Sequence, residues 1–282
     1  MKMEKLKKVS EKEIAKSVVK ATENGFNITA TVQAHIANGF DQLFNDKFYM
    51  KENSKTDKVP VFNLPNIMVQ REFLKVYKNN KKKFDALVPV DERENFEDFV
   101  EYLQNNPMCV NCGSCMENCY NNKAYTQYPL KAICDLRQLY RLLKNQMGVV
   151  GDIVQYTINS KNARLNGSGE IHNEFILDTY VKIARLNPDT KYYTYTKNYK
   201  LLANRKLPKN LIVNLSDFGT TELILAHKDS FEKKINVFKV VSPEEFEKLE
   251  SEGCKTLCYG VSCSTCRLCT KKSGITIYCA EH

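Results

Sequence analysis

The sequence predicts an α/β protein whose core is a full or partial barrel of parallel strands. An N-terminal helical region and a C-terminal cysteine-rich loop flank this core. From residue 162 onward, strand-like apolar runs alternate with amphipathic segments, which is typical of parallel strands with helices outside. The first hundred residues have helical periodicity and contain none of the eleven cysteines. The predicted divisions are therefore 1–106, 107–252 and 253–282.

Four amphipathic segments predict the helices of the N-terminal region. They cover residues 10–21, 30–44, 67–78 and 96–106. The first begins with Ser10 and Glu13 at capping-box spacing. Residues 51–60 predict a polar connector. The basic segment 78–84 (KNNKKKF) predicts a solvated turn, although its lysines also suit an anionic partner.

The central part of the chain predicts the alternating elements. Helices are expected at 130–147, 151–161, 173–187 and 242–250, and strands at 162–171, 191–198, 211–219 and 235–240. The last helix has Ser242 as its cap and Pro243 in its first turn.

Three of the expected strands end in polar or glycine-containing segments, at 166–170, 196–198 and 214–217. Because parallel sheets bind ligands at the carboxyl ends of their strands, these ends predict a cofactor site, with ordinary loop chemistry as the alternative. The candidate cofactor-binding residues are Gly167, Ser168, Gly169, Glu170, Lys197, Asn198 and Ser216.

The composition indicates a soluble globular protein, with 43% hydrophobic and 27% charged residues. The charged first residues do not resemble a secretory signal, and no apolar run is long enough to span a membrane, so we expect a cytoplasmic protein. In a reducing compartment, closely spaced cysteines indicate metal binding or redox chemistry rather than disulfides. The net charge of +9 is modest evidence for an anionic partner.

Two cysteine runs dominate the prediction of chemistry. Residues 109–119 have the spacing C-x2-C-x2-C-x3-C, and residues 258–269 have C-x4-C-x2-C-x2-C. Three cysteines at C-x2-C-x2-C from one loop suit a cubane iron–sulfur cluster, in which each thiolate reaches a different iron atom. Zinc is the alternative metal, since zinc knuckles also use closely spaced cysteines. The predicted ligands are Cys109, Cys112, Cys115, Cys119, Cys258, Cys263, Cys266 and Cys269.

Three cysteines and two histidines lie outside the set of predicted metal ligands. Cys134 falls within an expected helix and suits a small buried side chain. Cys254 and Cys279 flank the second run and are possible substitute ligands, as is the terminal His282. His172 follows the glycine-containing strand end, where a lone histidine is more often structural than catalytic.

The order of these features resembles the gene product 88 family of phages and mobile elements. The resemblance depends on Asn118-Cys119-Tyr120, on residues 164–197 (RLNGSGEIHNEFILDTYVKIARLNPDTKYYTYTK), and on the late cysteines with His282. It covers roughly residues 109–282, and the N-terminal hundred residues lie outside it.

The chain also resembles the radical S-adenosylmethionine enzymes. In those enzymes three cysteines from one loop hold a cubane with one open iron, and a glycine–glycine–glutamate strand end contacts the amino group of the cofactor. Gly167, Gly169 and Glu170 would occupy the analogous place. The usual C-x3-C-x2-C order is absent here, and a fourth cysteine would close the open iron.

Two functions from different classes follow. The first is a radical S-adenosylmethionine-like enzyme with two [4Fe-4S] clusters, a small-molecule cofactor at the strand ends and an unnamed substrate. The second is a non-catalytic iron–sulfur or zinc protein that binds nucleic acid or a host protein. Its support is the basic segment 78–84 and the aromatic–basic stretch 191–200 (KYYTYTKNYK), although that stretch equally predicts a buried strand with alternate tyrosines in the core.

Overall fold

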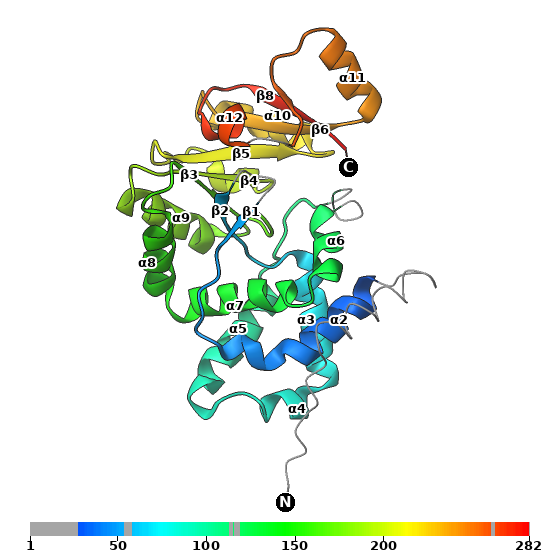
Figure 1. Ribbon diagram of the computed structural model, residues 1–282, viewed down its shortest axis with the longest axis vertical. Helices are drawn as coiled ribbons and strands as arrows, with labels where there is room; N and C mark the ends of the chain where they lie inside the picture. The colour runs from blue at the N-terminus through cyan, green and yellow to red at the C-terminus, as the bar shows by residue number, and fades with distance from the viewer. Residues whose placement is uncertain (1–27, 54–57, 113–114, 116–118, 261–262, 282) are drawn as a thin grey trace, which may run out of the picture.

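Figure 1 shows a computed structural model of the chain, which has a helical part at one end and a sheet-containing part at the other. The structure describes residues 28–53, 58–112, 115, 119–260 and 263–281. The helix expected at 10–21 and the terminal His282 lie outside these residues.

The helices expected before residue 107 are confirmed wherever the chain is described. They are α2 (Ile28–Gly39) with η1 (Phe40–Phe44), α3 (Ile67–Asn79) and α5 (Arg93–Asn105). The helices α4 (Lys81–Asp85) and η3 (Val90–Glu92) were not expected, and α4 lies where the sequence predicted a turn. An aromatic cluster holds them together, in which the Phe40 ring stacks on Phe84 with centroids 4.1 Å apart and meets Phe96 edge-on. The basic segment 78–84 forms the end of α3 and most of α4, where Lys81 pairs with Asp85 at 2.7 Å.

The central helices include the four that the periodicity predicts. They are α6 (Tyr120–Gln127), α7 (Lys131–Lys144), α8 (Gln146–Thr157), α9 (Glu174–Leu186), α10 (Thr221–His227), α11 (Pro243–Ser251) and α12 (Cys263–Cys266), with η5 (Tyr199–Leu202), η6 (Lys228–Ser230) and η7 (Leu268–Thr270). As expected, Ser242 caps α11, accepting a hydrogen bond from the Glu245 N–H at 3.2 Å. The sequence predicted α7, α8, α9 and α11, but it did not predict α6, α10 or α12.

Eight strands form one sheet. They are β1 (Lys51–Asn53), β2 (Val59–Phe62), β3 (Asn162–Leu165), β4 (Lys191–Thr196), β5 (Leu211–Asp217), β6 (Asn236–Val241), β7 (Leu257–Cys258) and β8 (Thr276–Ala280). Their order is β1-β2-β3-β4-β5-β6-β8-β7, and every neighbouring pair is parallel except β1 with β2. The strand–helix alternation thus produced the parallel sheet that it predicts.

The structure corrects two expectations about this sheet. A closed barrel is not formed within the described residues, because β1 and β7 remain edge strands of three and two residues and do not pair with each other. The segment 51–60 is not simply a connector, since β1 and the start of β2 lie in it. The N-terminal region therefore supplies two strands of the sheet in addition to its helices.

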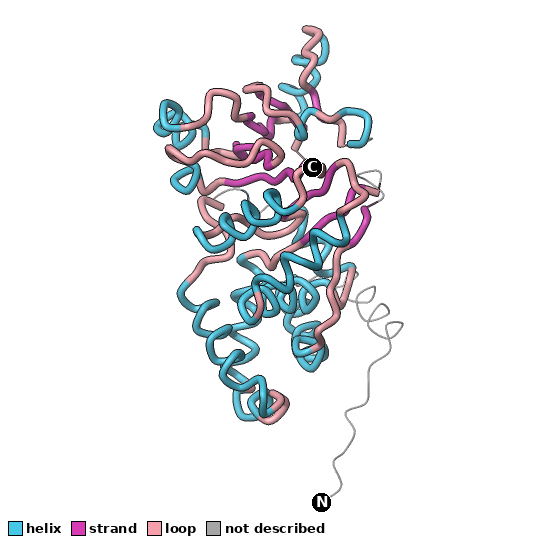
Figure 2. Tube along the Cα trace, turned by 90° about the vertical axis from the view of Figure 1, so that its left-hand side faces the viewer, coloured by secondary structure: helices cyan, strands magenta, loops and turns pink. Residues whose placement is uncertain are grey.

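The two faces of the sheet are covered differently. Ala163, Tyr192 and Val213 belong to the main core, together with apolar side chains of α8 and α9. Residues one position along each strand point the other way, so Tyr193 and Ile212 form a second apolar group against which Tyr195 and Cys269 pack. We call this second side the cysteine face. Figures 1 and 2 show the C-terminal segments on the side of the sheet away from the large helices.

For the stretch 191–200, the structure shows a buried strand and not an exposed surface for stacking on bases. Tyr192 and Tyr193 are buried on opposite faces of β4, and Tyr195 is half-buried. These rings are not free to stack on bases. Within the described part of the chain, no helix is long and apolar enough to cross a membrane.

Candidate metal centres

The glycine-containing segment after β3 runs close to the end of β2. The Gly167 N–H donates to the Phe62 carbonyl at 3.1 Å, and the Leu64 N–H donates to the Ser168 carbonyl at 3.2 Å. Gly169 has φ +81°, and a Cβ there would lie 2.8 Å from the Leu64 carbonyl oxygen. Both the backbone conformation and the close approach therefore require glycine at position 169.

Glu170 joins the ends of two neighbouring strands. Its carboxylate accepts the Ile171 N–H at 2.7 Å through one oxygen and the Lys197 N–H at 2.9 Å through the other. Burial raises the pKa of this carboxyl group, and hydrogen bonds from Thr196 and the two N–H groups oppose that rise. With three donors bound, the carboxylate keeps about one lone-pair site, so Glu170 can still accept one hydrogen bond from a ligand.

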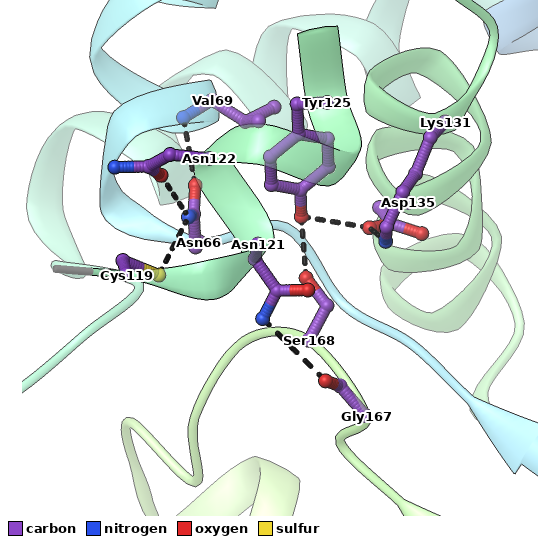
Figure 3. A network of polar contacts seen from close by, with 10 residues as sticks. All are labelled: Asn66, Val69, Cys119, Asn121, Asn122, Tyr125, Lys131, Asp135, Gly167 and Ser168. Atoms are coloured by element: carbon purple, nitrogen blue, oxygen red, sulfur yellow. Dashed lines mark hydrogen bonds and ion pairs between the residues drawn. The ribbon is translucent and has the colours of Figure 1, made fainter. Parts of the chain in front are cut away.

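Cys109 and Cys119 of the first run lie at the starts of two helices. The Ile67 N–H, in the first turn of α3, donates to the Cys109 sulfur at 3.4 Å. The Asn66 side chain donates to the Cys119 sulfur at 3.7 Å (Figure 3). Cys119 is itself the N-cap residue of α6. These N–H groups lower the pKa of the two thiols and so oppose the effect of burial.

The four thiols of this run share one neighbourhood. Burial raises the pKa of the Cys109 thiol most, and negative charge on Glu170, Cys119 and Cys112 raises it further. Burial likewise raises the pKa of the Cys119 thiol, and charge on Cys115 adds to this. The raised pKa values favour protonated thiols at Cys109 and Cys119, so binding of a metal at this run would release protons.

Three asparagines hold this run in place, and two of them donate to carbonyls at the strand ends. Asn111 has φ 51° and donates to the Lys197 carbonyl at 2.7 Å. Asn121 donates to the Gly167 carbonyl at 3.5 Å. The Asn66 amide, besides contacting Cys119, accepts the Val69 N–H at 3.0 Å and so caps α3 (Figure 3). The cysteine run is thereby held beside the segment 166–170.

A buried polar network fixes Ser168 to the helical part. The Tyr125 hydroxyl hydrogen-bonds to the Ser168 hydroxyl and donates to Asp135 at 2.7 Å, and Asp135 pairs with Lys131 at 2.6 Å (Figure 3). Burial raises the pKa of Asp135, while Lys131 opposes the rise. Ser168 therefore points toward α6 and α7, and its position is set by them.

The other predicted strand-end residues have structural contacts of their own. Asn198 donates to the carbonyls of Ile171 and His172, at 3.1 and 3.2 Å. Lys197 is buried, with its ammonium group 5.7 Å from the centre of the Phe218 ring. Ser216 lies on β5, where its carbonyl accepts the Tyr199 hydroxyl at 2.6 Å. Lys197 and Asn198 thus adjoin Glu170 and the segment that follows it, and Ser216 lies on the next strand.

His172 is buried against the helical part. Its Nε2 lies 2.7 Å from the Tyr102 hydroxyl and its Nδ1 lies 3.2 Å from the Glu170 carbonyl oxygen. Burial lowers the pKa of His172 to about 4 and raises the pKa of Tyr102 to about 12. This neutral, enclosed imidazole supports the structural role that the sequence favours.

The second cysteine run packs on the cysteine face. The Asn214 side chain donates to the Cys269 carbonyl at 3.2 Å, and the Tyr195 hydroxyl donates to the Cys269 sulfur. Burial raises the pKa of Cys269 to about 12, and charge on Cys258 and Cys266 adds to this. Charge on Cys263 also acts on Tyr193. All four predicted ligands of this run therefore lie near the same part of β4.

Arg164 gives this centre a positive neighbour. Its guanidinium lies over the Tyr195 ring at 4.9 Å, and its charge lowers the pKa of both Cys258 and Cys269. At the first run, negative charge on Glu170 and on neighbouring cysteines raises the pKa of Cys109 instead.

The arrangement of the thiols bears on which kind of metal group they could bind. Among the described residues, no three Cys, His, Asp or Glu side chains are grouped so as to bind one metal ion. A cubane holds its cysteines through separate iron atoms, and so accepts thiolates that a single ion would not gather. Both donor sets consist of thiols with N–H or O–H donors beside them, which fits a cluster whose sulfurs accept hydrogen bonds.

The family comparison gives a relationship for most of the chain. The gene product 88 family model matches residues 74–272. The protein belongs to the gene product 88 family. The match begins earlier than the resemblance at 109–282 suggested, so it includes part of α3 and all of α5. No curated protein and no solved structure matches the chain.

Sequence reasoning missed the residues that surround the thiols. Asn66 had a detectable signal, since it directly precedes an amphipathic helix as an N-cap should. Asn111, Arg164 and Tyr195 had none, because nothing local in the chain shows which strands will be neighbours. Their roles follow from the pairing of β3, β4 and β5.

Proposed function

We propose that this gene product 88 family member is an iron–sulfur protein with two [4Fe-4S] clusters. The first cluster would be held by Cys109, Cys112, Cys115 and Cys119 at the carboxyl edge of the sheet. The second would be held by the run 258–269 on the cysteine face. The main support is that each run brings its sulfurs to the same sheet, with hydrogen-bond donors on Cys109, Cys119 and Cys269.

We further propose that the first cluster belongs to an S-adenosylmethionine-dependent enzyme of a phage or mobile element. One observation favours this: the Cys109 sulfur lies close enough to Glu170 for the carboxylate charge to raise the pKa of the thiol. When present, a cluster with an open iron would bind the amino and carboxylate groups of S-adenosylmethionine and deliver an electron to its sulfonium. Glu170 would accept a hydrogen bond from the amino group, and the backbone at 167–169 would lie beside it.

Two features of the chain constrain how such an enzyme could bind S-adenosylmethionine. Four cysteines are available at the first run, so S-adenosylmethionine requires that one of them leave an iron open. Glu170 already accepts hydrogen bonds from two N–H groups and from Thr196, and therefore its one remaining acceptor site would recognise the cofactor.

The experiment is anaerobic purification, with iron and sulfide analysis and EPR spectra before and after addition of S-adenosylmethionine. Cys269→Ala is the useful background, because it is expected to leave the first cluster as the only EPR signal. We expect S-adenosylmethionine to change that signal, and dithionite to yield 5′-deoxyadenosine. An unchanged signal without 5′-deoxyadenosine would reject the enzyme and leave the iron–sulfur protein. A folded protein without iron would reject both.

A second candidate is a non-catalytic metalloprotein that binds single-stranded nucleic acid. The observation that favours it is on the helical side: Tyr128 is 59% exposed, and the Lys51 ammonium lies 6.0 Å from the centre of its ring. An exposed ring beside a lysine can stack on a base while the lysine contacts phosphate.

Fluorescence anisotropy with single-stranded DNA and RNA over a salt series tests this candidate. Tyr128→Ala is expected to weaken binding about 10-fold, the loss of one stacked base. Tyr259→Ala is the matched control, because Tyr259 is 58% exposed and lies beside Glu250 of the acidic helix α11. Equal binding by wild type and Tyr128→Ala, or no dependence on salt, would count against it.

A further inference from the structure

The last strand brings a fifth cysteine to the second centre. Cys279 on β8 is paired in register with Cys258 on β7. Residues paired in register on neighbouring parallel strands have their side chains on the same face of a sheet. The Cys279 side chain therefore lies on the same face as that of Cys258, and its sulfur donates to the Ala280 carbonyl at 3.5 Å. The chain therefore leaves the sheet just after Cys258 and returns with Cys279 beside it.

Strand alternation decides which way Cys279 points. Its neighbours Tyr278 and Ala280 pack against the apolar group formed by Val241, Phe246 and Leu257. Cys279, one position from each, faces the opposite side of β8. That is the side on which charge on Cys258 and Cys269 reaches it.

Burial also distinguishes Cys279 from the other cysteines of this region. Cys279 is 7% exposed, whereas the Cys266 side chain is exposed to solvent. A buried cysteine in a strand is commonly a small apolar side chain. Here its sulfur meets other thiols instead of an apolar group, which is the environment expected of a metal ligand.

Cys254 provides the contrast. It also flanks the second run in sequence, but it packs against the apolar group of Val241 and Phe246. Its sulfur lies 3.5 Å from the Thr256 hydroxyl. Of the two flanking cysteines, one points toward the thiols of the run and the other points away from them.

We infer that Cys279 is one of the four thiolate ligands of the second metal centre, which would take the other three from the run 258–269. The inference rests on the proposed function, because it assumes that the run 258–269 binds a metal. On binding, the Cys279 thiol would lose its proton to solvent and its thiolate would form a bond to the metal. The metal class is thiophilic: iron in a cluster, or zinc.

The test compares Cys279→Ala with Cys269→Ala as the positive control and Cys254→Ala as the matched negative control. Iron, zinc and sulfide are measured per chain in anaerobically purified full-length protein, together with EPR of the reduced state. We expect Cys279→Ala and Cys269→Ala each to lose about half of the wild-type iron, the content of one of two clusters. Cys254→Ala should keep all of it.

The first cluster serves as the internal standard for folding, since its EPR signal should persist in all three variants. If Cys279→Ala does not yield folded protein, Cys279→Ser keeps the size and polarity of the side chain and is measured in the same way. Full metal content and an unchanged second signal in a folded Cys279 variant would overturn the inference.

The outcomes also separate this inference from the proposed function. Two centres in the wild type and in Cys279→Ala would overturn the inference alone. Zinc in place of iron at the second centre, lost in Cys279→Ala, would support the ligand and reject the second cluster. A wild-type protein without iron or zinc would overturn both.

Discussion

The Cys109–Cys119 run and the Cys258–Cys269 run contact the same sheet in different ways. The first lies at the carboxyl edge, where asparagine side chains from α6 and from the run itself bind backbone carbonyls of the strand ends. The second lies on the cysteine face, where side chains of β3, β4 and β5 contact it. An edge is where parallel sheets leave room for a ligand, whereas a face is covered by packing.

Charge distinguishes the two runs as clearly as position does. Glu170 lies near Cys109, whereas Arg164 lies near Cys258 and Cys269. Net charge and hydrogen bonds to sulfur set the reduction potential of a cluster. We therefore expect a lower potential at the first centre than at the second, which would suit electron transfer from the first to the second or reduction of a ligand at the edge.

The largest expected effect is the loss of one cluster at a time. Cys109→Ala should abolish the EPR signal of the first centre and leave the second, and Cys269→Ala should do the reverse. Each single variant should retain about half of the iron and the double variant almost none, because each run supplies its own thiolates. Iron analysis and EPR of the three variants check this. If either single variant loses both signals, the two centres are not independent as the comparison assumes.

A backbone substitution should separate the two regions by stability. Gly169→Ala places a Cβ 2.8 Å from the Leu64 carbonyl at φ +81°, whereas Gly253→Ala, at φ +75°, meets nothing within 4 Å. We expect Gly169→Ala to lower the free energy of unfolding by about 3 kcal/mol, from strain plus the steric overlap. Gly253→Ala should cost about 1 kcal/mol, from strain alone.

Urea unfolding followed by circular dichroism measures both variants. Because the two glycines share a left-handed conformation, the difference between them isolates the close approach of segment 166–170 to the end of β2. Equal losses would mean that the edge is looser than the contacts of Gly169 indicate.

The sequence predicted more of the scaffold than of the surroundings of the thiols. Amphipathic periodicity located α3, α5, α7 and α9, because a helix with one apolar face is visible within a single segment. Strand–helix alternation predicted a parallel sheet for the same local reason. Strands of three or four residues are too short to show a periodicity. The sequence therefore did not predict β1 or β2, and β1 and the start of β2 fall in the polar segment 51–60.

Closure of the sheet and the contacts of the thiols depend on pairings between strands that are far apart in the sequence. Whether a parallel sheet closes depends on its edge strands, and here these are the short β1 and β7. Arg164 and Cys269 meet because β3, β4 and β5 are neighbours, although the two residues lie about a hundred positions apart. The cysteine spacings predicted which thiols act together, and only the fold indicates that Cys279 lies among them.

The buried His172 predicts a pH dependence that belongs to the edge region. Its pKa falls from 6.5 to about 4 on folding, so below pH 6.5 the unfolded chain binds a proton that the folded chain does not. Stability should therefore decrease as pH falls through this window, by about 2 kcal/mol between pH 7.5 and pH 5 from this group. Urea unfolding at the two pH values measures it.

His172→Gln is the matched variant, because glutamine can still hydrogen-bond to Tyr102 but does not titrate. The variant should lose less stability than the wild type over the same interval. An identical pH dependence in the two proteins would show that His172 is protonated when folded, and that the edge is more open to water than its burial indicates.

The smallest expected effect comes from Asn66, which lies where α3 begins beside the first centre. Asn66→Asp keeps an oxygen to accept the Val69 N–H, so the helix cap should survive. The substitution removes the N–H donor to the Cys119 sulfur and adds a negative charge. Both changes should lower the reduction potential of the first cluster and leave that of the second unchanged. A potentiometric EPR titration of both centres measures this, with the second centre as the control within the same molecule. A potential that shifts equally at both centres would contradict the separation of edge and face, because a local charge should act mainly on the cluster that it adjoins.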